Sequence, residues 1–278
     1  MSVDYEAQYN NRARVPEHPA IMAGWARDAA AYRAEHPAVT VPYGAGERQA
    51  VDLFQGKGEG LVLFVHGGYW QALDRSSFGH LARGANGHGV TVGIVGYDLC
   101  PSVRIADIVD QVRAACAALY RRERRRPVVA GHSAGGHLAA CMLATDWQAF
   151  DPDLPADLVP AAYAISGLFE LRPLVPTSIN KALGLDEAEA DRMSPLLWRP
   201  PAGLSLDAVV GAEESDEYLR QSRAIVERWG AAAVATRYEA LAGADHFTVI
   251  APLAEPGSAM TRRLVALARG ETDPSRRY

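Results

Sequence analysis

Gly-His-Ser-Ala-Gly-Gly-His, at residues 131–137, is the stretch of the sequence that decides the fold. The apolar run at residues 127–130 precedes it and is typical of a buried parallel strand. Residues 137–145 follow it and are apolar on every side, as expected of a helix inside a core. A strand, a Gly-x-Ser-x-Gly turn and a buried helix together indicate a sharp turn that holds its serine clear of the sheet. We therefore predict Ser133 as a nucleophile, next to the free N–H groups of a helix N-terminus.

The composition of the 278-residue chain is that of an ordinary globular protein, with 49% hydrophobic and 22% charged residues. Its net charge of −5 argues against nucleic acid or an anionic membrane as a partner. The arginine-rich run at residues 121–126 follows a predicted helix, whose C-terminal end favours cations, so it does not change this conclusion. There is no apolar run of the ~20 residues needed to span a bilayer and no signal-peptide pattern. We expect a cytoplasmic protein that acts on a small molecule.

The three cysteines, Cys100, Cys116 and Cys141, are odd in number and widely spaced. This pattern predicts neither a disulfide framework nor a metal knuckle. We expect buried, reduced thiols instead. The sequence also contains no zinc-binding or phosphate-loop pattern, so we expect no metal and no cofactor. Nothing in it decides the oligomeric state, and a homodimer stays open.

Strand and helix patterns alternate along the chain. The expected strands lie at residues 39–43, 49–54, 61–65, 90–95, 127–130, 161–165, 206–210 and 233–238. The first two are expected to form an antiparallel hairpin at a sheet edge. The expected helices lie at residues 16–33, 105–120, 137–145, 217–229 and 252–268. This order predicts one domain, residues 1–278, with a mostly parallel sheet and helices on both faces.

Two segments are expected to lie over this domain. Residues 16–33 carry apolar side chains at helical spacing and predict an N-terminal covering helix. Residues 168–201 contain five prolines and little periodicity, and they are too long for a plain connection. We interpret them as a partly helical, cap-like insertion that covers the site.

A serine nucleophile needs a histidine to take its proton and a carboxylate to orient that histidine. In a sheet of this kind the expected order is serine, acid, histidine, with the last two on loops after late strands. His246 is the only histidine after residue 137 and follows the last predicted strand, so we predict it as the base. Glu213, Glu214 and Asp216 share the loop after the preceding strand. We favour Glu214 as the acid, and the other two stay as alternatives.

The segment His66-Gly67-Gly68 leaves a buried strand with no Cβ to shield its backbone N–H groups. A loop of this type supplies donors to the oxyanion of a tetrahedral intermediate. We predict an oxyanion hole made by Gly67 and Gly68 on one side and Ala134 on the other. His66 is expected to brace the loop, whereas His132 and His137 are interpreted as packing or surface positions.

Three aromatic residues lie close in sequence to these predicted catalytic groups. Tyr69 and Trp70 follow the oxyanion glycines, and Phe247 follows the predicted base. We predict that they form a flat slot for an aryl ring. The alternative is that some of them pack the loops, and Trp70 is the one most expected to do so.

Taken together, these motifs resemble the serine-dependent kynurenine formamidases of the α/β-hydrolase superfamily. The matching pieces cover most of the chain: Gln8-Tyr-Asn-Asn-Arg12, His66-Gly-Gly-Tyr-Trp70, Tyr97-Asp-Leu-Cys-Pro101, Gly131-His-Ser-Ala-Gly135, Ile165-Ser-Gly167, Glu217-Tyr-Leu-Arg-Gln-Ser222 and Asp245-His-Phe247. The resemblance implies an α/β-hydrolase fold and places the acid at Glu214, where the family often has aspartate.

The resemblance also implies an activity, the hydrolysis of an aryl formamide such as N-formylkynurenine. Such a substrate carries a charged amino-acid tail, for which Ser166, Arg172 and Asn180 are the candidate contacts, with no ground for choosing among them. Carboxylesterases share the resemblance, so an esterase for short acyl esters is the alternative. A non-catalytic receptor that kept the fold is the remote alternative.

Overall fold

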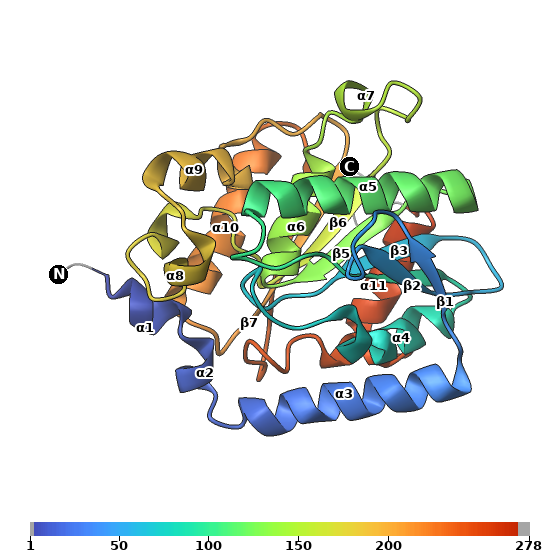
Figure 1. Cartoon of the computed structure of the whole chain (residues 1–278), viewed down its shortest axis with the longest axis horizontal. Coiled ribbons are helices and arrows are strands. Elements are labelled where there is room, and N and C mark those ends of the chain that lie inside the picture. The colour runs from blue at the N-terminus through green and yellow to red at the C-terminus, as the bar shows by residue number, and fades with distance from the viewer. Residues whose placement is uncertain (1–2, 272–278) are drawn as a thin grey trace, which may run out of the picture.

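Eight strands form one mostly parallel sheet, in the order β1-β2-β4-β3-β5-β6-β7-β8, in the computed structural model, which describes residues 3–271 (Figure 1). The strands are β1 Val39–Pro42, β2 Ala50–Phe54, β3 Leu61–Val65, β4 Thr91–Val95, β5 Val128–His132, β6 Ala161–Ile165, β7 Ser205–Gly211 and β8 Ala235–Leu241. β2 runs antiparallel to both β1 and β4, and all other neighbours are parallel. The predicted sheet and its edge hairpin are confirmed.

Helices cover both faces of the sheet (Figure 1). They are α1 Tyr5–Tyr9, α2 Asn11–Arg14, α3 His18–Glu35, α4 Ala82–Asn86, α5 Ile105–Glu123, α6 Ala134–Leu143, α7 Trp147–Phe150, α8 Asn180–Leu183, α9 Glu187–Arg192, α10 Asp216–Gly230 and α11 Ala259–Ala268. α5, α6 and α10 pack on one face, and α3, α4 and α11 pack on the other. The sheet is therefore the middle of three layers.

Strand β3 shows how one strand supplies two cores. Leu61, Leu63 and Val65 point to the face that α5, α6 and α10 cover. Val62 and Phe64 point to the opposite face, toward α3, α4 and α11. All five side chains are buried, which is why the strand is apolar throughout instead of alternating.

Two elements near the C-terminus differ from the prediction. The expected helix at residues 252–268 is a 3₁₀ turn at Ala251–Ala254 followed by α11, which begins only at Ala259. Pro256 and Gly257 lie between the two and interrupt the helix. The last strand, β8, extends to Leu241 because it pairs with β7 along its whole length, although as an edge strand it is half exposed and lacks an apolar run.

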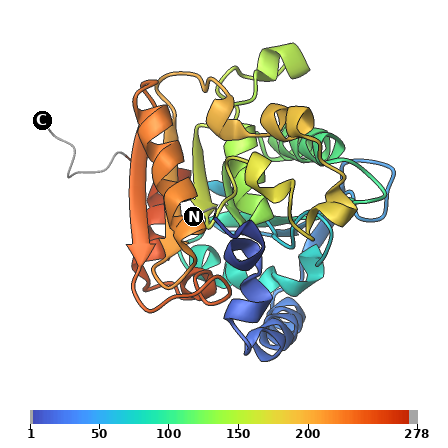
Figure 2. The same cartoon turned by 90° about the vertical axis from the view of Figure 1, so that its left-hand side faces the viewer.

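The N-terminal segment and the insertion meet at one end of the molecule, where α1 lies beside residues 168–201 (Figure 2). The Glu6 carboxylate accepts hydrogen bonds from the backbone N–H (2.7 Å) and the hydroxyl (2.6 Å) of Ser178. These contacts hold the pKa of Glu6 below its ordinary value, so the carboxylate stays charged at neutral pH. The insertion itself contains α8, α9 and two 3₁₀ turns.

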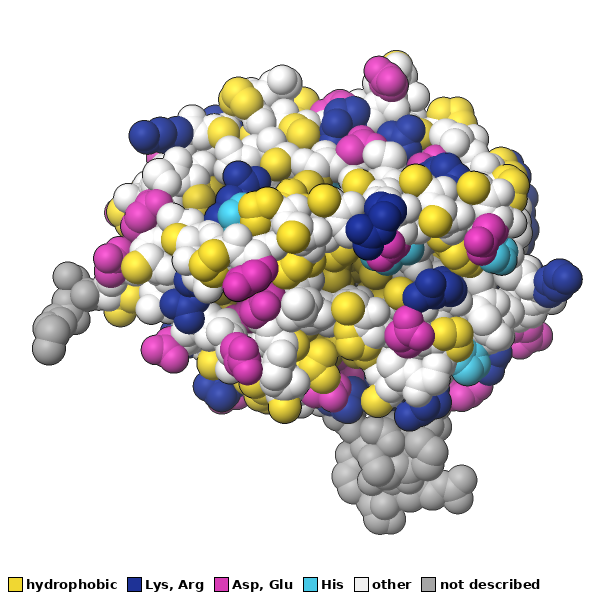
Figure 3. All heavy atoms as spheres, turned by 90° about the horizontal axis from the view of Figure 1, so that it is seen from below, with side chains coloured by type: hydrophobic (Ala, Val, Ile, Leu, Met, Phe, Trp, Pro, Cys, Tyr) yellow, Lys and Arg dark blue, Asp and Glu magenta, His cyan; other side chains and the backbone are white. Residues whose placement is uncertain are grey.

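The surface carries mixed charge. Basic and acidic side chains are interspersed on the face shown in Figure 3. In the arginine-rich run, Arg121 and Arg126 form ion pairs with Asp151 and Asp157. The run thus behaves as a solvated helix end, as the charge pattern predicts. Within residues 3–271, no helix is both long and apolar enough to cross a membrane.

Candidate active site

Ser133 lies at the sharp turn between β5 and α6. Its φ of 57° and ψ of −118° are a strained combination for a residue with a side chain. The turn is held because the Ser133 N–H donates to the carbonyl of Ile165 at 2.8 Å. A Cβ on Gly135 would lie 1.9 Å from the carbonyl oxygen of Val65, so only glycine allows α6 to approach β3 this closely.

Three side chains from three separate loops meet at this turn. The Nε2 atom of His246 lies 3.1 Å from the Oγ atom of Ser133. Its Nδ1 atom lies 2.6 Å from the Oε2 atom of Glu214. The chain of contacts is therefore serine, imidazole, carboxylate, the arrangement that lets an imidazole remove a hydroxyl proton. All three residues are buried.

The loop after β7 presents one of its three carboxylates to the imidazole. Besides His246, the Glu214 carboxylate accepts from the Gly211 N–H at 2.8 Å and from the Ser166 hydroxyl at 2.5 Å. Glu213 and Asp216 are exposed, and within the described residues it is Glu214 whose carboxylate bonds to the imidazole. Three donors fix the orientation of one carboxylate, which in turn fixes the ring of His246.

His132 supports the histidine loop, a role that its position directly before Ser133 did not indicate. Its ring lies 4.8 Å from the ring of His246, and burial holds the pKa of His132 well below its ordinary value. The neutral ring donates its Nε2–H to the carbonyl of His246 at 2.8 Å. His137 is also buried, and its ring bonds to the carbonyl of Met193 in the insertion.

The glycine loop after β3 lies against the serine turn. A Cβ on Gly67 would be 2.9 Å from the Cβ of Ser133, so the loop backbone directly faces the serine side chain. Within the part of the chain that the structure describes, the N–H groups of Gly67, Gly68 and Ala134 have no hydrogen-bond acceptor. They are thus free to bind an oxyanion formed at Ser133.

His66 braces this loop from below. Its ring stacks between the rings of Tyr97 and Phe78, with centroid distances of 4.3 and 5.8 Å. Its Nδ1 atom bonds to the Gly67 carbonyl at 2.8 Å. Burial lowers the pKa of His66 to about 4, so the ring is neutral at pH 7 and its Nδ1–H is the donor.

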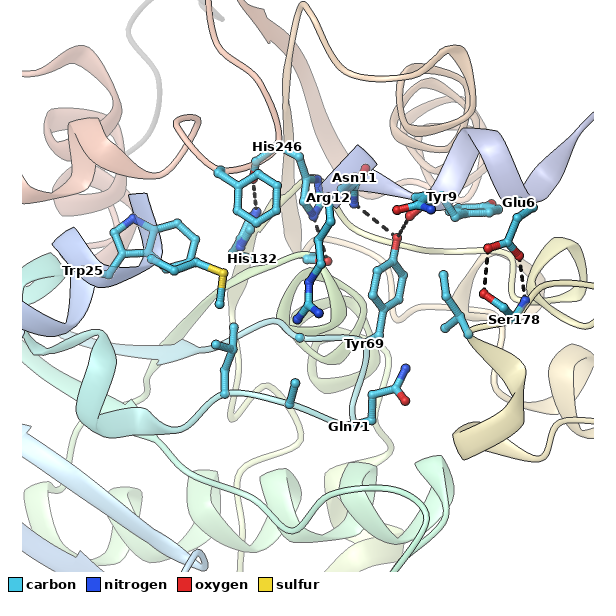
Figure 4. A pocket seen from close by; sticks show the side chains of 18 residues that line it. Glu6, Tyr9, Asn11, Arg12, Trp25, Tyr69, Gln71, His132, Ser178 and His246 are labelled. Carbon is cyan, nitrogen blue, oxygen red and sulfur yellow. Dashed lines mark hydrogen bonds between the residues drawn. The ribbon is translucent and has the colours of Figure 1, made fainter. Parts of the chain in front are cut away.

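A cavity of about 420 Å³ opens above Ser133 and His246, a volume suited to a small molecule (Figure 4). The side chains that line it form one apolar part and one more polar part. An apolar part is formed by Met22, Trp25, Leu73 and Phe247. A more polar part is formed by Glu6, Asn10, Asn11, Arg12, Tyr69, Gln71 and Ser178.

Much of the cavity wall therefore comes from the first twenty-five residues. The insertion contributes only Ser178 and Ile179 among the described lining residues. The sequence signal for this wall is Gln8-Tyr-Asn-Asn-Arg12, which matters only through the family resemblance. Nothing in its composition or spacing marks it as part of a site.

A hydrogen-bond network fixes the N-terminal segment over the serine. The Tyr69 hydroxyl donates its one proton to the Tyr9 carbonyl at 2.6 Å. The Tyr218 hydroxyl lies 2.7 Å from the Tyr69 oxygen and therefore donates to it. The Asn11 amide donates to both hydroxyls, at 3.2 and 3.0 Å. The Tyr218 ring packs 4.6 Å from His246, so this network connects the cavity wall to the proposed base.

Of the three aromatic residues predicted to form a slot, two line the cavity and one does not. Tyr69 and Phe247 are part of the lining, and Phe247 is joined there by Trp25 at 6.1 Å. Trp70 is fully buried, and its ring packs edge-on against His137 at 5.0 Å. The prediction that Trp70 lines the aryl slot is wrong, and the structure shows the alternative for this residue, since its ring packs into the core beneath the loop.

Replacing Trp70 by alanine should therefore cost stability, with a loss of about 3–5 kcal/mol in the free energy of unfolding. Urea denaturation measures this loss. Trp198→Ala is the matched control: that ring lies half-buried on the insertion, so its removal should cost less. If Trp70→Ala left the free energy of unfolding unchanged and raised KM, Trp70 would have to contact substrate after all.

The three candidates for the substrate tail also lie outside the cavity lining. Ser166 is occupied with Glu214, and Arg172 forms an ion pair with Asp191 at 2.6 Å. Asn180 bonds to the backbone of its own loop. Each is held by a partner that the sequence did not reveal, and none of the three lines the cavity next to Ser133.

The sheet order, the strained serine turn and the serine–histidine–carboxylate chain define an α/β hydrolase. A family model described as an alpha/beta hydrolase fold matches residues 62–250. A carboxylesterase from a metagenomic library, EstE1, shares the fold with a TM-score of 0.69 at 20% identity, over 92% of this chain and 98% of that one. The predicted fold class is confirmed.

Relatives with higher sequence identity identify the family within the α/β hydrolases. The kynurenine formamidases of Danio rerio and Salmo salar are 30% and 31% identical to the chain, over 82% of it and 80–81% of each relative. The chain belongs to the kynurenine formamidase family. A protein from Silicibacter sp. TM1040, assigned as a thioesterase, shares 34% of its residues with the chain. Its crystal structure superposes with a TM-score of 0.86, over 95% of this chain and all of that one.

Proposed function

We propose that the protein is a serine hydrolase that converts N-formylkynurenine into kynurenine and formate. The observation that carries the proposal is the hydrogen-bonded chain of Ser133, His246 and Glu214 at the base of a partly aromatic cavity. Membership in the kynurenine formamidase family supports the aryl formamide as substrate. The assignment of roles to individual residues rests on their geometry.

In the first half of the proposed reaction, the Ser133 Oγ attacks the formyl carbon while His246 Nε2 takes the hydroxyl proton. Glu214 stabilises the imidazolium and holds its tautomer. The negative charge that develops on the formyl oxygen is bound by the N–H groups of Gly67, Gly68 and Ala134, and each such donor is worth about 2.7–4 kcal/mol of transition-state stabilisation.

Collapse of this intermediate breaks the bond between the formyl carbon and nitrogen. His246 returns its proton to the nitrogen, so the arylamine leaves as a neutral amine and a formyl ester remains on Ser133. In the second half, His246 takes a proton from water as the water oxygen attacks the ester carbon, and it then gives that proton to the Ser133 oxygen as the ester bond breaks. The product leaves as formic acid, which loses its remaining acidic proton to solvent and becomes formate.

The cavity has room for the two parts of this substrate. A formyl group carries only hydrogen on its carbonyl carbon, so its side of the site can be small. The aryl ring of the leaving amine fits the apolar part of the cavity, where Trp25 and Phe247 offer ring faces and Met22 offers a thioether. We place the ring there, with Tyr69 bordering the opposite side.

Esters and thioesters are the second candidate substrates. The same serine, histidine and carboxylate would hydrolyse them, and the Silicibacter relative assigned as a thioesterase is the specific observation in their favour. A receptor without catalysis is disfavoured because all three positions carry usable chemistry. Labelling by a fluorophosphonate probe separates a receptor from an enzyme, since only an activated serine reacts.

A comparison of substrates tests the proposal. The value of kcat/KM for N-formylkynurenine should exceed that for a short-chain aryl acetate by far more than the ~10–200-fold that a methylene-sized difference in fit provides. Release of kynurenine and formate gives the measurement, with a short-chain acyl thioester as the third substrate. Faster turnover of the ester or the thioester, or no release of kynurenine, would contradict it.

We expect this enzyme in the cytoplasm, acting on a small molecule. The three cysteines of the chain are free and buried, which suits a reducing compartment. A homodimer remains a proposal, and sedimentation velocity at two protein concentrations tests it. A mass that stays that of one chain at both would contradict the dimer.

A further inference from the structure

We propose that Arg12 binds the carboxylate of the substrate's amino-acid tail and thereby selects anionic aryl formamides; this inference rests on the proposed function. In N-formylkynurenine the tail is a short chain beside the formamide on the same ring. A group that binds its carboxylate must therefore line the cavity that contains Ser133. Arg12 is the only arginine or lysine among the described residues that do so.

The Arg12 side chain extends from α2 and lines the cavity, where it is exposed to solvent (Figure 4). Its guanidinium has no ion pair or hydrogen bond with any of residues 3–271. The one acidic residue among the described lining residues, Glu6, is already bound to Ser178 through both carboxylate oxygens. A permanent positive charge is thus left without a protein partner inside the proposed site.

The backbone on both sides of Arg12 is held in place. The carbonyl of Tyr9 and the side chain of Asn11 are bonded to Tyr69, and Asn11 is bonded to Tyr218 as well. The Asn10 side chain caps α2 by accepting from the Ala13 N–H at 3.2 Å. The backbone from which the Arg12 side chain extends is therefore fixed before substrate arrives, which reduces the entropy lost on binding.

A guanidinium suits this task because its planar N–H groups can form two parallel hydrogen bonds with a carboxylate. It also stays charged at every pH at which the enzyme works. The three tail candidates from the sequence do not compete for this role, since their side chains are bonded elsewhere. Arg12 thus supplies the contact that they were expected to supply.

The test compares two aryl formamides, N-formylkynurenine and formanilide, which lacks the tail. In the unchanged enzyme, kcat/KM should favour N-formylkynurenine. Arg12→Gln should reduce this preference by about 10- to 100-fold, mainly through a raised KM for N-formylkynurenine. Arg12→Lys keeps the charge without the paired N–H groups, so its preference for N-formylkynurenine should lie between those of the unchanged enzyme and Arg12→Gln. The preference should also weaken with added salt in the unchanged enzyme and not in Arg12→Gln.

Arg27→Gln is the matched control, because it removes the same charge from an exposed position on α3 that lies outside the cavity lining. It should keep the preference of the unchanged enzyme. If Arg12→Gln also keeps that preference, the assignment of Arg12 is overturned while the formamidase activity stands. An equal loss in Arg27→Gln would mean that the net charge of the protein sets the preference, which also overturns it. An unchanged enzyme that favours esters over both formamides would instead overturn the proposed function.

Discussion

Replacing Ser133 by alanine should lower kcat for N-formylkynurenine by about 10⁶-fold, the scale seen when a serine hydrolase loses its nucleophile. The alanine has no hydroxyl to form the acyl-enzyme, so the two-step route through a serine ester is closed. The N–H groups of Gly67, Gly68 and Ala134 remain, and they should preserve a small residual rate above that in water. Single-turnover assays with a large excess of enzyme can measure a rate this slow.

The alanine variant should fold normally, since Ser133 forms its main structural contact through its backbone N–H. Its melting temperature and its near-UV circular dichroism are the controls. A fluorophosphonate probe should label the unchanged enzyme and not the variant. If Ser133→Ala turned over substrate at the normal rate, the proposed mechanism would be lost, whatever the fold.

Replacing Glu214 by glutamine should lower kcat by about 10⁴-fold. Glutamine has the same shape, but one of its two terminal atoms is a donor. Facing the His246 Nδ1, this amide favours the tautomer whose proton is on Nε2, which then cannot accept the Ser133 proton. Assays at saturating substrate, from pH 6 to pH 9, measure kcat and exclude a simple shift of the pH optimum.

The loop of Glu214 supplies its own controls. Glu213→Gln and Asp216→Asn remove one negative charge each from exposed neighbours that do not touch His246. Both should retain kcat within a few-fold of the unchanged enzyme. A severe loss in Asp216→Asn with a mild one in Glu214→Gln would transfer the role of acid to Asp216.

Local sequence was sufficient to predict the core of the fold. Strand β3 is apolar throughout because helices cover both its faces, so its five residues indicate a central strand. The serine turn is equally local, since small residues must surround Ser133 where α6 meets β3. Features determined within a few residues of chain are visible in the residues themselves.

The acid required more than local sequence. Three carboxylates share one loop, and their spacing gave a ranking without a decision. What distinguishes Glu214 in the structure is a pair of donors, the Gly211 N–H three residues before it and the Ser166 hydroxyl from the loop after β6. The Ser166 hydroxyl reaches Glu214 only because β6 and β7 are adjacent in the sheet, so the sequence read along the chain could not supply this partner.

The cavity wall was the part that sequence reasoning missed. Arg12 and Asn11 lie on a helix of four residues, too short to show a periodic pattern. Trp70 was misplaced for a related reason, because adjacent residues of a loop can point in opposite directions. Tyr69 lines the cavity, while Trp70 is buried beside His137.

The attachment of the N-terminal segment to α10 has a consequence for biosynthesis. The hydrogen bonds from Tyr9 to Glu217 and from Asn11 to Tyr218 join residues more than two hundred positions apart. Contacts of such long range carry a high loop-closure cost and are favoured late in folding. During translation the first partner emerges from the ribosome long before the second exists. A nascent or partly folded chain thus has no complete substrate pocket, even if its serine turn has already formed.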